Sequence, residues 1–152
     1  MLGRVLDLAH LDMQIVLHIR GHSSDTTVKE AYLHVLDLVR EKCTPDHKFQ
    51  LHCFHGTEYT VEVWRKSFPN TYFSFSGKVR TFTDQQKDAL QLIPSHRLLV
   101  ETDSPYLGPP GVSIYSPIYI VSVARLVAEV RGDDLPMLLE ITTKNTRMLF
   151  TG

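Results

Sequence analysis

Residues of the types that commonly bind metal ions in proteins follow three short apolar runs of this sequence. They are two histidines and two carboxylates: His18, His52, Glu101 and Asp103. Imidazole and carboxylate groups bind divalent cations, and a bound cation acidifies water for hydrolysis. The histidines and Asp103 are therefore candidate metal ligands. They lie far apart in the sequence, whereas a finger-type structural zinc site takes ligands as close pairs. The spacing favours ligands that come from different strands.

The elements that must position these residues alternate along the chain. Four short apolar runs are typical of buried strands, and each is followed by an amphipathic stretch: 13–18, 49–54, 72–75 and 98–100. Alternating strands and helices predict an α/β fold with a parallel sheet, in which the carboxyl ends of the strands meet at one edge. A (β/α)₈ barrel needs eight such units in about 250 residues, so about four units in 152 residues indicate a partial TIM-like barrel. A small open doubly wound sheet is the alternative.

Helix boundaries are predicted by local signals. Thr27 with Glu30, and Thr83 with Gln86, fit the capping-box pattern. Residues 2–11 have apolar side chains at roughly helical spacing. Two further helices are predicted at about 118–130 and 135–150, separated by Gly132 and started by Asp134 and Pro136. We expect a single domain over residues 1–152, because no linker or repeat divides it.

Composition narrows the classes of partner. The chain is 43% hydrophobic and 22% charged with a net charge of −1, so any binding of nucleic acid must come from a local site. No apolar stretch approaches the roughly 20 residues that span a bilayer, and no membrane partner is expected. The start of the chain does not resemble a secretory signal, which predicts an intracellular protein, nuclear or cytoplasmic. Cys43 and Cys53 are then expected to be thiols.

Five segments resemble successive motifs of the TatD deoxyribonuclease family. They are Leu-His-Ile-Arg at 17–20, His-Cys-Phe-His-Gly at 52–56, Phe-Ser-Gly at 75–77, Leu-Leu-Val-Glu-Thr-Asp-Ser-Pro-Tyr-Leu at 98–107, and the ending at 142–150. The Glu-Thr-Asp-x-Pro-Tyr-Leu segment is the most specific. The order matches along nearly the whole chain, so the resemblance implies the C-terminal half of a TIM-like barrel of the metal-dependent hydrolase superfamily.

The resemblance also implies an activity and a site. It implies a nuclease that hydrolyses DNA with divalent metal in a 3′ to 5′ exonuclease manner, with RNA or hybrids as further substrates. His18, His52 and Asp103 match metal ligands, Asp103 and Glu101 match catalytic carboxylates, and Arg20 falls where it could contact phosphate. His55 stands where the family commonly has a small hydroxyl residue; a phosphate contact and a plain rim residue are both open. Mg²⁺ is the family expectation, with two ions in the complete enzyme and Mn²⁺ or Zn²⁺ as alternatives.

The sequence departs from the family pattern in its metal ligands. The His-x-His pair and a bridging glutamate that family members carry are absent from these 152 residues. A two-metal site without them holds metal poorly, so we expect a truncated chain with weak or no activity. Two other readings stay open: a non-catalytic fragment that associates with a partner through exposed barrel edges, and another hydrolase of the superfamily that acts on cyclic amides or lactones.

Overall fold

The computed structural model describes residues 2–11, 13–21, 28–113 and 115–151, and its centre is a parallel four-stranded sheet. The strands are β1 (Gln14–His18), β2 (Lys48–His52), β3 (Thr71–Phe75) and β4 (Leu98–Val100). The α-helices are α1 (Leu2–Leu6), α2 (Lys29–Lys42), α3 (Glu58–Ser67), α4 (Asp84–Leu92), α5 (Ile120–Arg131) and α6 (Leu135–Phe150). Short 3₁₀ turns add η1 (Gly77–Thr81), η2 (Ser95–Arg97) and η3 (Pro117–Tyr119).

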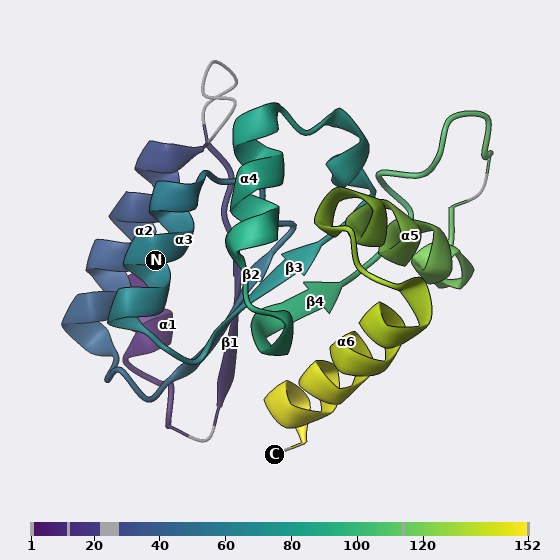
Figure 1. The fold of residues 1–152 in the computed structure, drawn as a ribbon. Coiled ribbons are helices and arrows are strands. Elements are labelled where there is room, and N and C mark those ends of the chain that lie inside the picture. Colours follow the sequence, from purple (N-terminus) through teal and green to yellow (C-terminus); the bar gives the residue numbers. More distant parts are fainter. Residues whose placement is uncertain (1, 12, 22–27, 114, 152) are drawn as a thin grey trace.

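The strand order decides between the two architectures that the sequence left open. The order in the sheet is β1-β2-β3-β4, so each strand pairs with the next one along the chain. A doubly wound sheet reverses direction at a switch point, whereas a barrel keeps the sequential order. Right-handed crossovers in sequential order place the connecting helices on one side of the sheet. Figure 1 shows α1, α2 and α3 to the left of the sheet, α4 above it, and α5 and α6 to the right, with α6 beside β4, as in part of a barrel.

The helix-covered side of the sheet forms the main core. Alternate strand residues point to it, among them Phe49, Leu51, Phe73 and Leu98, which are fully buried. Trp64 of α3 packs edge-on against Phe49 with ring centroids 5.9 Å apart. Because this cluster joins residues of α2, α3, α4 and α5 to the strands, it fixes the positions at which the strands end.

The opposite side of the sheet is more polar. It carries Gln50 in β2 and Ser74 in β3, which alternate with the core residues. A second, smaller cluster covers part of this side, where Leu149 of α6 packs with Tyr72 and Leu99. The end of α6 therefore reaches around to the face of the sheet that α3 and α4 leave uncovered.

The local helix signals are confirmed where the structure describes them. Thr83 and Gln86 form the predicted capping box of α4. Gly132 ends α5 with a φ of 69°, a left-handed conformation that glycine adopts without strain. The side chain of Asp134 caps α6 by accepting a hydrogen bond from the backbone of Met137. The predicted capping residue Thr27 lies outside the described residues.

The prediction of a helix across residues 2–11 is wrong for its second half. Helix α1 ends at Leu6, which is buried, whereas Leu8 and Leu11 are exposed. Local spacing alone could not determine this, because a helix of this length depends on the surface against which it packs.

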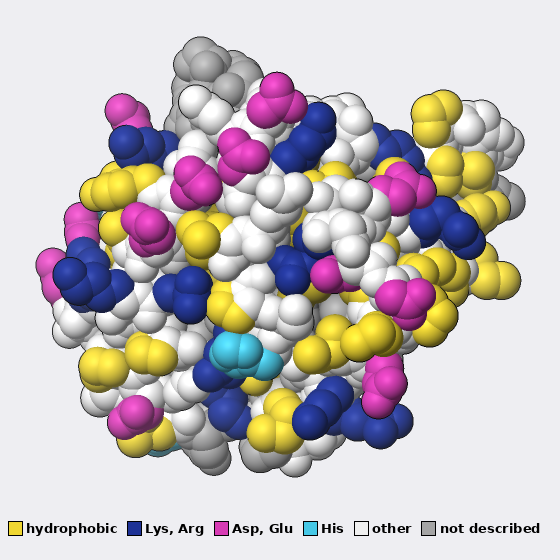
Figure 2. Space-filling view, in the orientation of Figure 1, with side chains coloured by type: hydrophobic (Ala, Val, Ile, Leu, Met, Phe, Trp, Pro, Cys, Tyr) yellow, Lys and Arg dark blue, Asp and Glu magenta, His cyan; other side chains and the backbone are white. Residues whose placement is uncertain are grey.

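The surface in Figure 2 carries no single charged patch. Acidic and basic side chains are interspersed over the face shown, in keeping with a net charge of −1. Apolar side chains gather toward its right-hand edge, around the segment that leads into α5, where Ile118 and Val121 are exposed.

Two further expectations concern the cysteines and membrane spans. Cys43 and Cys53 are free thiols, as predicted. Among the described residues, no helix has both the length and the apolar character needed to cross a bilayer.

Candidate metal centre

The register of the sheet brings the two predicted histidine ligands together. His18 and His52 are the last residues of β1 and β2, and they are direct partners across the parallel pair. Side chains at paired positions point to the same side of a sheet. The two imidazole rings accordingly lie with their centroids 4.7 Å apart.

Two carboxylates that follow β4 reach the His52 ring from opposite sides. Asp103 Oδ1 lies 3.2 Å from His52 Nε2, and Glu101 Oε2 lies 2.8 Å from His52 Nδ1. The structure thus gathers His18, His52, Glu101 and Asp103 at the carboxyl end of the sheet, although they come from three strands. This edge is where a barrel carries its active site.

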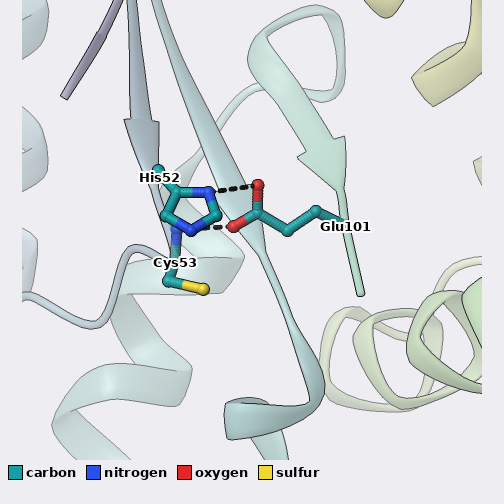
Figure 3. Close-up of side chains that lie close together, drawn as sticks. All are labelled: His52, Cys53 and Glu101. Carbon is teal, nitrogen blue, oxygen red and sulfur yellow. Dashed lines mark hydrogen bonds and ion pairs between the residues drawn. The ribbon is translucent and has the colours of Figure 1, made fainter. Parts of the chain in front are cut away.

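Both oxygens of the Glu101 carboxylate are held by the protein (Figure 3). The backbone N–H of Cys53 donates to Oε1, while His52 Nδ1 and Gln50 Nε2 contact Oε2. A carboxylate that accepts a hydrogen bond from one imidazole nitrogen fixes the ring and leaves the other nitrogen for a metal. Glu101 is therefore placed to orient His52, whose Nε2 faces Asp103.

The two histidines have opposite electrostatic surroundings. Burial, together with the nearby His52 and Arg20, lowers the pKa of His18. Hydrogen bonds to the Cys53 side chain and to Glu101 raise the pKa of His52 well above its usual value. These surroundings favour the neutral form of His18, the form in which an imidazole can ligate a metal, whereas they favour the protonated form of His52.

Cys53 stands closer to this centre than the sequence suggested. Ligand atoms of His52, Cys53 and Glu101 all lie within 4.8 Å of one another, which makes these three a grouping that could hold a cation. The predicted ligands His18 and Asp103 are not members of that grouping. However, both Glu101 oxygens already accept hydrogen bonds, and burial raises the pKa of the Cys53 thiol, so the neutral thiol is favoured. The imidazole and carboxylate set with an open side is the better fit to a catalytic divalent cation.

A cleft opens beside this centre, with a volume of about 860 Å³. Arg20 and His55, the two predicted substrate contacts, both line it. Arg20 Nε donates to His18 Nε2 at 2.9 Å, so in this structure it occupies a histidine nitrogen that a metal could use. The His55 ring is mostly buried and its Nδ1 lies 2.8 Å from the carbonyl oxygen of Cys53. A phosphate contact by either residue stays a prediction.

Unusual backbone conformations gather around the same cleft. Within the described ranges, four non-glycine residues have positive φ values: Val28, Cys53, Asp103 and Leu107. All four also line the cleft. Left-handed φ values are costly for such residues and tend to occur at functional sites, where the fold stabilises them.

Sequence reasoning missed Lys78 and Tyr106, which line the cleft as well. Lys78 is the third residue after the end of β3 and lies within η1. A basic residue shortly after the third strand was the signal that could have pointed to it, since it had to lie at the same edge as the other strand ends.

Comparison with known proteins identifies the family. The family model described as TatD related DNase matches residues 1–151. The chain belongs to this family. The resemblance of its sequence motifs to the TatD family is thereby confirmed. Relatives of the chain include proteins named as a metal-dependent hydrolase and as an exonuclease.

Three curated relatives illustrate the range of the TatD family. The human 3′-5′ RNA nuclease TATDN2 is 30% identical over 97% of this chain and 19% of its own length. The uncharacterized metal-dependent hydrolase YcfH of Escherichia coli strain K12 is 35% identical over 92% of this chain and 50% of its own length. The 3′-5′ ssDNA/RNA exonuclease TatD of Enterobacter lignolyticus is 35% identical over 66% of this chain and 41% of its own length. The chain thus spans at most half the length of these relatives.

Solved structures agree on the fold. An uncharacterized amidohydrolase from Saccharomyces cerevisiae superposes with a TM-score of 0.68 at 19% identity, covering 97% of this chain and 57% of that one. A TatD family hydrolase from Entamoeba histolytica gives a TM-score of 0.68 at 17% identity, covering 92% of this chain and 52% of that one. The four strand–helix units are therefore part of a TIM-like barrel.

Proposed function

We propose that this chain forms the C-terminal half of a divalent-metal-dependent nuclease domain, in which His18, His52 and Asp103 bind a cation. The observation that carries the proposal is the convergence of two imidazole rings 4.7 Å apart with a carboxylate 3.2 Å from one of them, at the carboxyl end of a parallel sheet. Three ligands of this kind suit a catalytic site with a coordination position left for water or substrate.

The roles of the residues follow from their contacts. When bound, a divalent cation here would polarise a phosphodiester and acidify a water molecule. Glu101 holds the His52 ring so that Nε2 faces Asp103. Asp103, which is partly exposed and lines the cleft, would accept a proton from the attacking water in this proposal. Arg20 lines the same cleft and supplies positive charge for the substrate phosphate.

We propose single-stranded DNA or RNA as the substrate class and 3′ to 5′ exonuclease action. Two relatives support this, because one is named a 3′-5′ RNA nuclease and the other a 3′-5′ ssDNA/RNA exonuclease. Mg²⁺ is the proposed metal, with Mn²⁺ or Zn²⁺ also compatible with two imidazoles. For the complete enzyme we propose two metal ions, the second bound by residues outside this chain. We also propose an intracellular location, in the nucleus or the cytoplasm.

Metal binding tests this proposal directly. Mn²⁺ and Mg²⁺ are titrated by calorimetry into the chain and into Asp103→Asn, and hydrolysis of 3′-labelled single-stranded DNA and RNA is followed beside it. Asp46→Asn is the matched control, since Asp46 is exposed in the turn before β2, at the opposite end of the strands. We expect Asp103→Asn alone to lose metal affinity and whatever hydrolysis the chain shows. Equal metal affinity of wild type and Asp103→Asn contradicts the assigned site.

A second candidate function rests on the free edge of the sheet. Among the strands that the structure describes, β1 lies at one edge of the sheet, and Val16 on it is 50% exposed. Unpaired edges with exposed apolar residues favour association with another chain. Sedimentation across a concentration series tests this: self-association that Val16→Lys abolishes supports a role in protein association, and a monomer at all concentrations contradicts it.

A further inference from the structure

Lys78 lies on the wall of the cleft without an acidic partner. It belongs to η1, it is half-buried, and it lines the same cleft as Arg20. The described part of the chain gives it no ion pair, whereas exposed Lys42 and Lys87 each pair with an aspartate. Burial lowers the pKa of Lys78, and so does the nearby Arg20. A half-buried ammonium that no carboxylate of the described residues pairs with favours an anion as its partner.

The second cationic residue of η1, Arg80, contacts backbone carbonyl groups. Arg80 Nη1 donates to the backbone carbonyls of Gly77 at 3.2 Å and of Leu107 at 3.5 Å. Its guanidinium thus ties η1 to the loop that follows β4. Gly77 allows this approach, because a Cβ atom there would lie only 2.2 Å from the carbonyl oxygen of Leu107.

The loop held in this way contributes an aromatic ring to the same cleft. Tyr106 precedes Leu107, lines the cleft and is 70% exposed. A large aromatic side chain with this exposure gains little packing energy from contacts within the folded protein, and its ring offers a flat face to a ligand. Lys78 and Tyr106 thus both line the cleft, and they come from the two segments, η1 and the loop, that Arg80 connects.

We propose that Lys78 and Tyr106 form a nucleotide subsite that binds one unit of the single-stranded substrate outside the metal centre. The Lys78 ammonium binds a phosphate of the chain, and the Tyr106 ring stacks on a nucleobase. Positive charge along the backbone combined with an aromatic platform for the base is the arrangement by which proteins bind single strands without reading sequence. A duplex, whose bases are already stacked, offers no base to Tyr106.

This inference rests on the proposed nuclease function, and the two are tested separately by working without metal. Binding of a fluorescein-labelled oligothymidylate is followed by anisotropy in EDTA over a series of KCl concentrations. Four proteins are compared: wild type, Lys78→Ala, Tyr106→Ala and Lys66→Ala. Lys66 is an exposed lysine in the last turn of α3 and serves as the charge-matched control. Thermal unfolding of each variant confirms that it is folded.

Each variant has its own expected signature. Lys78→Ala makes the slope of log K against log salt less negative by about 0.7, the value for one phosphate contact on a single strand. Tyr106→Ala weakens binding about five- to tenfold with an unchanged slope, the effect of one lost base stack. That loss disappears with an oligonucleotide of abasic sites, since there is no base to stack. Lys66→Ala leaves both affinity and slope as in the wild type.

Several outcomes overturn the subsite. Lys78→Ala with the wild-type salt slope contradicts the phosphate contact, and an equal change for Lys66→Ala shows non-specific attraction alone. Equal loss for intact and abasic strands in Tyr106→Ala contradicts the stacking. None of these results touches the metal centre, because the EDTA experiments contain no metal. Conversely, the loss of metal affinity in Asp103→Asn tests the proposed function whatever the subsite does.

Discussion

The two sides of the central sheet have different physical tasks. On the helix-covered side, Phe49 and Leu51 of β2 are fully buried in the main core. On the other side, Gln50 and His52 of the same strand contact the Glu101 carboxylate. Strands of a parallel sheet that is covered on both faces are usually apolar throughout. The alternation in β2 separates a side that contributes apolar packing to the core from a side that carries the proposed metal site.

The comparison predicts that changes on the core side affect stability first. Phe49→Ala removes a ring that packs edge-on against both Trp64 and Phe68, and it leaves a cavity in a fully buried position. We expect a loss of about 3–5 kcal/mol in the free energy of unfolding. Urea denaturation measures it. A loss below about 1 kcal/mol would show that the core tolerates the cavity and that the division between the two sides is less sharp.

On the polar side, the largest effect is expected at Glu101. Glu101→Gln keeps the size of the side chain, but Cys53 and His52 contact different oxygens of the carboxylate, and an amide replaces one of these acceptors with an NH₂ donor. The His52 ring then loses its fixed orientation. We expect metal affinity to fall about 10- to 100-fold, as for other residues that orient a ligand.

Calorimetric titration of Mn²⁺ measures this change, with Glu129→Gln as the control because that residue is exposed on α5. If Glu101→Gln bound metal as the wild type does, His52 would be oriented by something other than this carboxylate.

A smaller effect is expected for Gln50, which supports Glu101 from the same strand face as His52. Gln50 Nε2 donates to Glu101 Oε2 at 3.2 Å. Gln50→Leu keeps most of the side-chain volume and removes one hydrogen-bond donor to Glu101. The net contribution of one such hydrogen bond is about 1 kcal/mol. We expect metal affinity to fall several-fold with little change in the midpoint of urea unfolding. A large loss of stability with unchanged affinity would assign Gln50 to the core instead.

The smallest effect is expected at Val16, on the same side of the sheet but in the edge strand. Its side chain is 50% exposed, and Val16→Thr keeps the β-branched shape. We expect a change within about 0.5 kcal/mol in the free energy of unfolding, as for most surface substitutions. Urea denaturation beside Phe49→Ala compares the two sides in one experiment. A loss near that of Phe49→Ala would mean that another segment covers β1 in solution.

Much of the fold could be predicted because its signals are local. The strand at 98–100 is observed as predicted, and the other three begin or end within two residues of the prediction. The capping box at Thr83 and the left-handed Gly132 are short-range features that need no partner. The end of α1 at Leu6 was missed because it depends on packing against the rest of the chain.

Candidate metal ligands and their position after the strands of a parallel sheet were predictable without a structure. Their types and their place after apolar runs indicated this, because parallel strands share one carboxyl edge. How these residues meet depends on the tertiary fold. The register that pairs His18 with His52, the positive φ of Asp103 and the approach of η1 to the 104–107 loop depend on contacts between segments far apart in the sequence. No local pattern specifies such contacts, since they arise only when the helices pack and fix the ends of the strands.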